Sequence, residues 1–366
     1  MQIAIDARDL ANVTTGVGRY LLNLLQHFPD LRPDFVFTLY TDRPIPVPQR
    51  AATLRTKILT GHPWLWKQVL MPIEQKRAHM DLFFVPSYST PVCNPAHAVV
   101  TIHDMIYTRY PQWTTRLERW RFATIVRYSA RFASRIIAVS EATRKDILTL
   151  TGVSPRKVKV IYEGVDPIFR ELPAEDLVAA GARLGLALPF ILYVGSLHHR
   201  RNVKRLLQAF AQLQRAGKIP HRLVLCGLNL FEHHELEQWV TELQLAEHVK
   251  YFGYVTDEDL VALYNLAELF VYPSMYEGFG LPVLEAMACG TPVITGNSSS
   301  LPEVAGDAAL LVDPHDTLAL SRAMASLIRE ASLRQELRER GQAQCRKFAW
   351  RTAAAETLDL FAEAAT

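Results

Sequence analysis

The chain has 366 residues, with 40 Lys and Arg against 37 Asp and Glu, so its net charge is only +3. This balance excludes a general nucleic-acid binder, which needs a strong basic excess. Hydrophobic residues make up 49% and charged residues 21%, values that exclude a disordered, collagen-like or low-complexity chain. The length predicts two domains of roughly 150 to 180 residues each.

The small net charge conceals an asymmetry between the two halves of the chain. Residues 1–170 contain 23 basic and 13 acidic side chains, whereas the remainder contains 17 and 24. Two lobes of opposite sign indicate that the first half meets an anionic partner, such as a membrane surface or a phosphorylated substrate. The alternative is two solvated surfaces that attract each other.

The cysteines and the apolar runs bear on the cellular compartment. Cys93, Cys226, Cys289 and Cys345 lie far apart without a C-x-x-C pair, so neither a zinc site nor a disulfide framework is indicated, and a reducing cytosol fits best. No apolar run approaches the ~18 residues that span a bilayer. We therefore expect a cytoplasmic protein.

Strand-like and helix-like segments alternate along the first half, a pattern typical of parallel sheets covered by helices. Ser140 is expected to cap a helix over 141–150, with Gly152 beyond its end. The expected strands are 2–6, 35–40, 82–85, 98–103, 136–139 and 157–161, and a further helix is expected over 17–28.

The second half repeats the same alternation. The polar segment 166–188 is expected to be a linker between two doubly wound units. We assign 1–168 to the first domain, 169–347 to the second, and 348–366 to a helical end that packs back on the first domain. The expected strands are 190–194, 222–226, 249–252, 269–271 and 292–295, and the expected helices are 203–216, 257–265, 282–289 and three that close the chain, the last over 350–364.

The most informative stretch is PSMYEGFGLPVLEAMACGTP, residues 273–292. Glu277 precedes a glycine-rich turn, Pro282 stands where a first-turn proline belongs, and Gly290 is a plausible C-cap. Backbone N–H groups over 279–281 would form an anion site at the helix start. Carboxylates beside such a site are favourable only if they bind hydroxyl groups, so Glu277 is expected to hold hexose hydroxyls and Glu285 a ribose. The alternative is a capped turn with solvated glutamates.

The chain resembles a known family at this point. EGFGLPVLEAMACGTPVI, together with YVGSLHHRRN, FGYV and the early TGVGRY, looks like the retaining nucleotide-sugar glycosyltransferases of family 4. The resemblance spans essentially the whole chain. It implies an α/β GT-B fold of two facing Rossmann-like domains, with the first domain binding the acceptor and the second the nucleotide-sugar donor.

The resemblance places most of the donor site in the second domain. Arg201 matches a lysine that binds the donor diphosphate, and Arg200 matches an adjacent basic position, which suits phosphate because guanidinium groups donate bidentately. Many relatives carry an arginine after the glycine that matches Gly195, but Ser196 stands here. The other donor-site residues that the resemblance implies are Gly227, Tyr254, Val255, Glu277, Gly278, Phe279, Gly280, Leu281 and Glu285.

The first domain is expected to contribute two segments. Gly16, Val17 and Gly18 would let backbone approach the diphosphate or the sugar, although an ordinary turn would look similar. His103 ends a predicted parallel strand, the edge favoured for sites. The resemblance gives it a role in holding the sugar and stabilising charge at the anomeric carbon, with Asp104 in support. The predicted catalytic residues are His103, Glu277 and Arg201.

The implied reaction is transfer with retention, in which the leaving phosphate helps to deprotonate the acceptor. Arginines and helix-start amides could stabilise the departing nucleoside diphosphate without a metal, and no D-x-D signature is present. The pairs His198–His199 and His233–His234 are the only metal candidates, and adjacent histidines point in different directions. We expect neither a metal nor another cofactor.

The segment 109–135 carries seven arginines and one glutamate. Arginines recur at near-helical spacing with Trp113, Trp120, Phe122 and Phe132 between them, which is typical of a helix that settles on an anionic leaflet. A helix with solvated arginines and a core-facing side is an equal alternative. Trp64 and Trp66 would add an interfacial loop or lie in the core.

These features together predict a hexosyltransferase, with mannose from GDP-mannose as the favoured donor and a lipid-linked or other glycan acceptor. The protein would act in cell-surface polysaccharide synthesis, at the inner face of the cytoplasmic membrane. Two alternatives remain at this point: a GT-B epimerase of the nucleotide sugar, and a non-catalytic nucleotide-sugar-binding scaffold. Only the scaffold would tolerate loss of His103 or Glu277.

Overall fold

The computed structural model describes residues 1–12, 16–47, 53–92, 96–186, 189–217, 219–231 and 234–365. The chain divides into two compact units. Unit 1 consists of Met1–Gly164 and Phe348–Thr366, and unit 2 of Val165–Lys347. The boundary therefore lies at 164/165, where the sequence suggested 168/169. None of the helices in the described part of the chain has the length and apolar character needed to cross a lipid bilayer.

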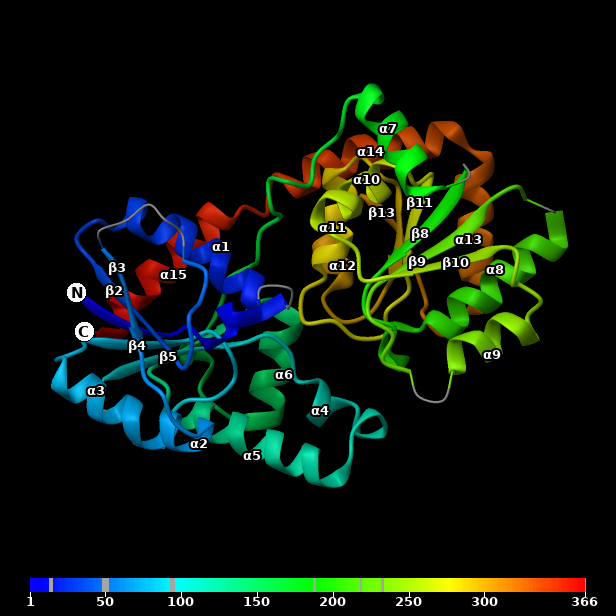
Figure 1. Cartoon of the computed structure of the whole chain (residues 1–366). Helices are drawn as coiled ribbons and strands as arrows, with labels where there is room; N and C mark the ends of the chain where they lie inside the picture. The colour runs from blue at the N-terminus through cyan, green and yellow to red at the C-terminus, as the bar shows by residue number, and fades with distance from the viewer. Residues whose placement is uncertain are drawn as a thin grey trace. The chain divides into compact units, whose positions relative to one another are not determined.

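Unit 1 is built on a seven-stranded sheet in the order β3-β2-β1-β4-β5-β6-β7 (Figure 1). Every strand pair is parallel. The central strands β1, β4, β5 and β6 are almost fully buried because helices cover both faces of the sheet. The strands are β1 (Gln2–Asp6), β2 (Val36–Thr41), β3 (Leu54–Ile58), β4 (Leu82–Val85), β5 (His97–Ile102), β6 (Arg135–Ala138) and β7 (Val158–Val160).

Two groups of helices cover this sheet. The long ones are α1 (Gly16–Leu31), α5 (Arg116–Phe132), α6 (Glu141–Thr151) and α15 (Trp350–Ala365). The short ones are η1 (Arg8–Asn12), α2 (Pro63–Leu65), η2 (Trp66–Leu70), α3 (Met71–Arg77), α4 (Ile106–Arg109), η3 (Pro111–Trp113) and η4 (Pro155–Lys157).

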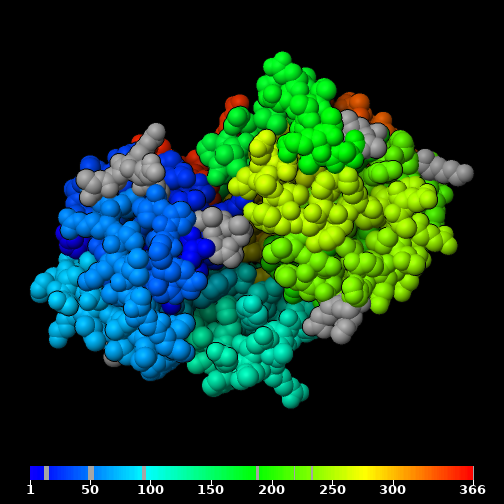
Figure 2. All heavy atoms as spheres, viewed as in Figure 1, coloured from blue at the N-terminus to red at the C-terminus, as the bar shows by residue number. Residues whose placement is uncertain are grey.

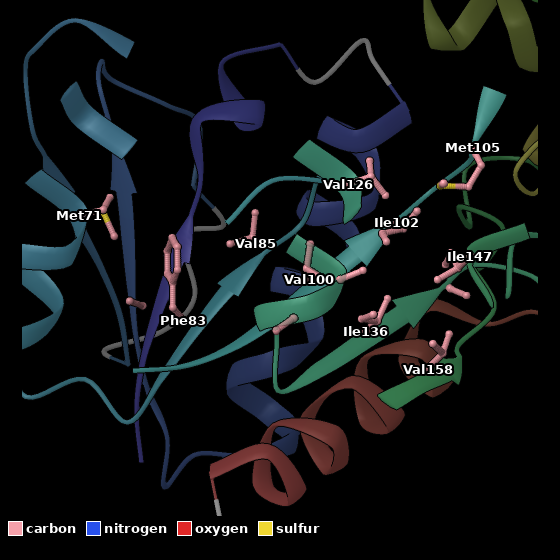
Figure 3. Close-up of a cluster of buried hydrophobic side chains, with 14 of the residues drawn as sticks. Met71, Phe83, Val85, Val100, Ile102, Met105, Val126, Ile136, Ile147 and Val158 are labelled. Atoms are coloured by element: carbon pink, nitrogen blue, oxygen red, sulfur yellow. The ribbon is translucent and has the colours of Figure 1, made fainter. Parts of the chain in front are cut away.

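Adjacent phenylalanines on β4 show how the two faces are filled, since successive strand side chains point to opposite sides. Phe83 belongs to the core beneath η2, α3, α5 and α6, in which Met71, Val126 and Ile147 also lie (Figure 3). Phe84 faces the other way, with its ring centroid 5.0 Å from that of Phe361 on α15. The C-terminal helix α15 therefore completes the core of unit 1, alongside α1.

The chain leaves unit 1 after Gly164 and returns to it at Phe348. At Gly164 the backbones of the outgoing and returning segments approach each other closely. A Cβ atom at this position would lie 2.2 Å from the backbone nitrogen of Trp350, the first residue of α15. Only glycine leaves room for this approach.

Unit 2 contains a six-stranded parallel sheet in the order β10-β9-β8-β11-β12-β13. Figure 1 shows α8 and α13 on one face of this sheet and α10, α11 and α12 on the other. The strands are β8 (Phe190–Val194), β9 (Arg222–Cys226), β10 (Val249–Gly253), β11 (Leu269–Tyr272), β12 (Val293–Gly296) and β13 (Ala309–Val312). The helices are α7 (Ala174–Leu184), η5 (His199–Arg201), α8 (Val203–Gly217), α9 (Glu235–Glu242), α10 (Asp257–Leu266), α11 (Leu281–Ala288), α12 (Leu301–Ala305), α13 (Thr317–Arg329) and α14 (Ala331–Cys345).

The structure confirms the expected α/β class with two Rossmann-like units. The expectation that 166–188 is a linker is wrong in one part, because α7 occupies Ala174–Leu184 and packs against α10. Ser140 caps α6 as expected, its hydroxyl accepting from the N–H of Thr143 at 3.0 Å. Cys226, Cys289 and Cys345 are buried free thiols, whereas Cys93 and His233 lie outside the described residues.

Candidate functional site

The candidate donor site lies at the point where the strand order of unit 2 reverses. The chain builds β8, β9 and β10 outward in one direction and then returns to place β11 on the other side of β8. In open parallel sheets, ligands bind at the carboxyl ends of the strands beside such a switch point. The loops that follow β8 and β11, residues 195–202 and 273–280, meet at this edge.

The Glu277 carboxylate is the centre of the hydrogen-bond network between these loops. Its Oε1 accepts from the hydroxyl of Tyr272 at 2.7 Å and from that of Ser274 at 2.9 Å. Its Oε2 accepts from Arg200 Nη1 at 2.8 Å. Arg201 Nε lies 3.3 Å from Oε1 and completes an ion-paired cluster of one carboxylate and two guanidinium groups.

Burial and charge act in opposite directions on Glu277. Only 7% of the residue is exposed, and this burial alone would raise its pKa. The attraction of Arg200 and Arg201 and the hydrogen bonds from Tyr272 and Arg200 outweigh burial and lower the pKa to about 2. Arg201 responds in the matching direction, its pKa being raised by Tyr272, Glu277 and Tyr193 in spite of its burial. Glu277 is therefore ionised throughout the physiological range and carries one negative charge against two positive ones.

Further hydrogen bonds order the two loops around the cluster. Arg200 Nη1 donates to the Tyr276 carbonyl at 3.0 Å, and the Met275 N–H donates to the Arg200 carbonyl at 2.9 Å. On the other side, Arg201 Nη1 donates to the hydroxyl of Ser196 at 3.0 Å. Ser196, the position where the sequence departs from the family pattern, thus orients a cation instead of supplying one.

His198 serves as a cap in this loop. Its Nδ1 accepts from the backbone N–H of Arg200 at 3.1 Å at the start of η5. Burial, followed by the neighbouring Arg200 and His199, lowers the pKa of His198 to about 4, so the ring is neutral and able to accept. His199 instead lies 3.5 Å from Glu235. Among the residues that the structure describes, no group of three or more His, Cys, Asp and Glu side chains is arranged to hold a metal ion.

The segment 278–281 leads into α11, which begins at Leu281 with Gly280 as its N-cap. Gly280 has φ 122°, a conformation that favours glycine. The N-cap is a glycine and therefore has no side chain with which to cap this helix start, and Phe279 is buried just before it. The anion site over 279–281 stays a prediction.

Gly227 ends β9 against the loop that carries the arginines. A Cβ atom here would lie 2.2 Å from the Gly195 carbonyl oxygen, and a Cβ at Gly195 would lie 2.6 Å from Arg201 Nη1. The two glycines therefore let the β8 and β9 loops approach each other beside Arg201. The role of Gly227 in donor binding stays a prediction.

We expect Gly227→Ala to lower the free energy of unfolding by about 2–3 kcal/mol, because φ is 130° and the added methyl group would overlap backbone. Urea or thermal denaturation measures this change. Gly217→Ala is the matched control, since a Cβ at this helix-end position meets no atom within 4 Å, and its effect should stay within about 0.5 kcal/mol. Equal stability of the two variants would contradict the close approach.

The remaining predicted donor-site residues lie on the loop after β10 and on α11. Tyr254 and Val255 follow β10, with Tyr254 55% exposed, so its ring is accessible to a ligand. Glu285 is buried on α11, where its Oε2 accepts from the Tyr264 hydroxyl at 2.9 Å. The ribose role of Glu285 and the hexose role of Glu277 stay predictions.

In unit 1, the glycine-rich segment forms the first turn of α1. The helix begins at Gly16, where a Cβ atom would meet nothing within 4 Å. Val17 is half-buried and Gly18 is buried. The role of this segment in approaching the diphosphate or the sugar stays a prediction.

His103 follows β5, and both of its ring nitrogens face protein acceptors. Nδ1 lies 3.2 Å from Glu163 Oε1 and Nε2 lies 2.8 Å from the Pro86 carbonyl oxygen. Because a carbonyl only accepts, Nε2 carries a proton, and the carboxylate favours a second proton on Nδ1. Burial alone would lower the pKa of His103, but Glu163 and the Pro86 carbonyl raise it. The structure thus favours an imidazolium ion, and a direct hydrogen bond from this ring to a sugar would have to displace one of the two acceptors.

Asp104 supports the loop after His103. Its Oδ1 accepts from the backbone N–H of Ile106 at 3.2 Å. Tyr20 lies edge-on to the His103 ring, with centroids 4.9 Å apart. The role of His103 in holding the sugar stays a prediction, as does the supporting role of Asp104.

The basic segment 109–135 folds mainly into α5. Arg116, Arg127 and Arg131 are exposed. Trp120 and Phe132 are 66% and 57% exposed, whereas Trp113 stacks on Tyr110 and Phe122 packs against Tyr107 and Tyr88. Trp66 is fully buried in the core, as one interpretation expected, whereas Trp64 is 62% exposed; an interfacial role of Trp64 stays a prediction.

Sequence reasoning missed three functional candidates: Glu163, Tyr272 and Ser274. Tyr272 is the last residue of β11, and Ser274 lies two residues later in the segment already singled out, so their position at a strand end was a usable signal. Glu163 has no such signal, since 60 residues separate it from His103. Only the pairing of β5, β6 and β7 brings the two together.

Comparison with known proteins agrees with this geometry. Residues 14–169 match the family model described as Glycosyltransferase Family 4, and residues 184–344 match Glycosyl transferases group 1. The O-antigen chain mannosyltransferase B of Escherichia coli is 35% identical over 266 residues, which cover 72% of this chain and 70% of that protein. The serotype-specific mannosyltransferase WbdA of Escherichia coli is 32% identical over 238 residues, 63% of this chain but only 29% of the much longer WbdA.

Among solved structures, HepE of Anabaena in complex with UDP and glucose superposes with a TM-score of 0.78 and 21% identity, over 99% of this chain and all of that one. This likeness shows the fold. A family 4 model matches the first half of the chain, a group 1 model matches the second half, and one relative is 35% identical over 72% of the chain. The chain therefore belongs to the glycosyltransferases of family 4 and group 1.

Proposed function

We propose that this glycosyltransferase transfers mannose from GDP-mannose, with retention of the anomeric configuration, to a lipid-linked glycan acceptor in cell-surface polysaccharide synthesis. The observation that carries the proposal is the Arg200–Arg201–Glu277 cluster at the switch point of unit 2. It leaves one positive charge in excess, on guanidinium groups held at fixed positions next to a helix start. A nucleoside diphosphate matches this arrangement in charge and in geometry.

The cluster also suits catalysis of transfer. Negative charge grows on the diphosphate as the glycosidic bond breaks, and pre-oriented guanidinium groups stabilise it without reorganisation. The departing phosphate oxygen would take the proton of the acceptor hydroxyl on the same face of the sugar, which gives retention. Because the two arginines provide this charge, no metal is required.

The choice of mannose is supported by the relatives, since the two mannosyltransferases of Escherichia coli named above share about a third of their aligned residues with this chain. A nucleotide-sugar donor of some kind is further supported by the UDP and glucose found in HepE.

A panel of nucleotide sugars tests the donor. We expect GDP-mannose to raise the melting temperature and to release GDP when a mannoside acceptor is present, and EDTA to leave this release unchanged. Stabilisation by UDP-sugars alone would refute the mannose assignment. NMR of the product's anomeric proton distinguishes retention from inversion.

The proposal of a lipid carrier for the acceptor rests on the surface of α5. This surface would contact the inner face of the cytoplasmic membrane, where the carrier lies. In Figure 2 the teal side chains of this helix lie on the outside of unit 1. Its one acidic residue, Glu118, is engaged in the N-terminal capping box with Thr115, so the arginines dominate the exposed surface.

We expect sedimentation with vesicles to increase with their content of anionic lipid and to decrease with salt. A double variant, Arg127→Gln with Arg131→Gln, should reduce binding roughly 30-fold, at about 1 kcal/mol for each lysine or arginine near the surface. Arg222→Gln with Arg322→Gln in unit 2 serves as the charge-matched control. Binding that is independent of anionic lipid would contradict the membrane role and leave the transferase proposal intact.

A further inference from the structure

Unit 1 contains a cavity of about 460 Å³ beside its own switch point. The strand order reverses between β1 and β4. Arg8 follows β1 and Ser89 follows β4, and both line the cavity, whose other walls come from α2, η2 and α5. Its position and its volume are those of a small-molecule site in a parallel sheet.

The polar side chains in the walls are already hydrogen-bonded to one another or to backbone. Gln68 Oε1 accepts from the Val92 N–H at 2.7 Å, and the Ser129 hydroxyl accepts from the Thr90 N–H at 3.0 Å. Tyr128 donates to the Val92 carbonyl at 2.5 Å. These hydrogen bonds connect the loop after β4 to η2 and to α5, so the walls of the cavity are ordered without a ligand. The surface that the walls present to the interior is mainly apolar.

The charged side chains that line the cavity, Arg8 and Lys67, are paired as well. Arg8 donates to both carboxylate oxygens of Asp6, at 2.8 and 2.7 Å, and Lys67 Nζ lies 3.8 Å from the same carboxylate. Lys67 also donates to the Ser89 hydroxyl. Since a sugar ring needs donors and acceptors that are not already used, this cavity suits an apolar ligand better than a saccharide.

Two apolar side chains that line the cavity are exposed to solvent. Trp64 on α2 and Ile125 on α5 both line the cavity and are 62% and 41% exposed. We propose that the cavity binds the alkyl or isoprenyl chain of an amphiphilic acceptor, next to the group that carries the acceptor sugar. Such a chain would cover Trp64 and Ile125 and requires no further hydrogen bonds. The inference deepens the proposed function and rests on its lipid-linked acceptor.

A series of methyl, butyl and octyl α-mannosides below their micellar concentrations tests the cavity. Direct binding without donor, measured by calorimetry, should tighten at least tenfold from methyl to octyl in the unaltered protein. Trp64→Ala and Ile125→Gln should each remove most of this gain and leave methyl α-mannoside binding unchanged. Both side chains are substantially exposed, so the variants should keep their fold, which circular dichroism checks.

Trp120→Ala is the matched control, because Trp120 is 66% exposed on α5 but does not line the cavity. A chain-length gain that persists in both cavity variants, or that is lost equally in the Trp120 variant, would overturn the proposal, the latter by pointing to a nonspecific apolar surface. Absence of transfer from GDP-mannose together with an intact chain-length gain would refute the proposed donor and leave the cavity assignment standing.

Discussion

Glu277→Gln is expected to lower kcat/KM for transfer by roughly 10²–10³-fold, the range seen when a group that stabilises developing charge is lost. It should also lower the free energy of unfolding by about 3–5 kcal/mol at pH 7. The amide has the same shape but no charge, so Arg200 and Arg201 would remain buried beside each other without their shared counter-ion. Transfer kinetics and urea denaturation measure the two effects.

The pH dependence of stability shows whether the charge of Glu277 causes the loss of stability expected in Glu277→Gln. The pKa of Glu277 is lowered from 4.5 to about 2, so its contribution is complete above pH 4.5 and is lost as the pH falls through 2. Glu277→Gln should lack this acid-side loss. Glu247→Gln, an exposed glutamate of the same unit, should change neither activity nor stability. Unaltered activity in Glu277→Gln would contradict the role of the cluster in binding the donor.

Glu163→Gln is expected to have the second largest effect. It removes the charged partner of His103 Nδ1 in a site where only 6% of the Glu163 side chain is exposed, which should cost about 1.5–3 kcal/mol of stability at pH 6. Transfer should fall at least tenfold, because the ring loses the interaction that holds its charge and orientation. NMR titration of the His103 ring and denaturation between pH 5.5 and 9 measure the change.

The sign of the pH effect follows from the direction of the shift. The pKa of His103 is raised above 6.5 in the folded protein. Its contribution to stability is therefore complete below pH 6.5 and is lost as the pH rises through the folded pKa. Glu163→Gln should remove this alkaline loss and return the ring to a lower pKa. Glu141→Gln, which breaks an exposed ion pair with Arg144, should leave both unchanged; an unshifted His103 titration in Glu163→Gln would show that the carboxylate does not set the ring's charge.

Local sequence predicted the strands that are buried on both faces. The bounds of β1, β4, β8 and β9 agree with those expected, because continuous apolar runs leave little choice of register. The edge strand β3, LRTKI, was missed, since it is largely exposed and its pattern is polar. The helix α7 was missed for a related reason: it follows a proline and buries only Ala180, so its apolar stripe is short.

The sequence by itself determined the alternation of strands and helices, the family, and the identity of Arg200, Arg201 and Glu277, because these properties depend on local pattern and on motifs in a fixed order. Only the tertiary structure decided how those groups are used. It showed a carboxylate that holds two arginines, a histidine whose ring nitrogens face Glu163 and the Pro86 carbonyl, and an apolar cavity at the second switch point.

The net charge of +3 likewise says little about the Glu277 cluster or the His103–Glu163 pair. Each depends on buried charges whose partners lie up to 77 residues away in the sequence. Such contacts arise when parallel strands distant in the chain become neighbours in a sheet, and no local pattern in the sequence encodes them.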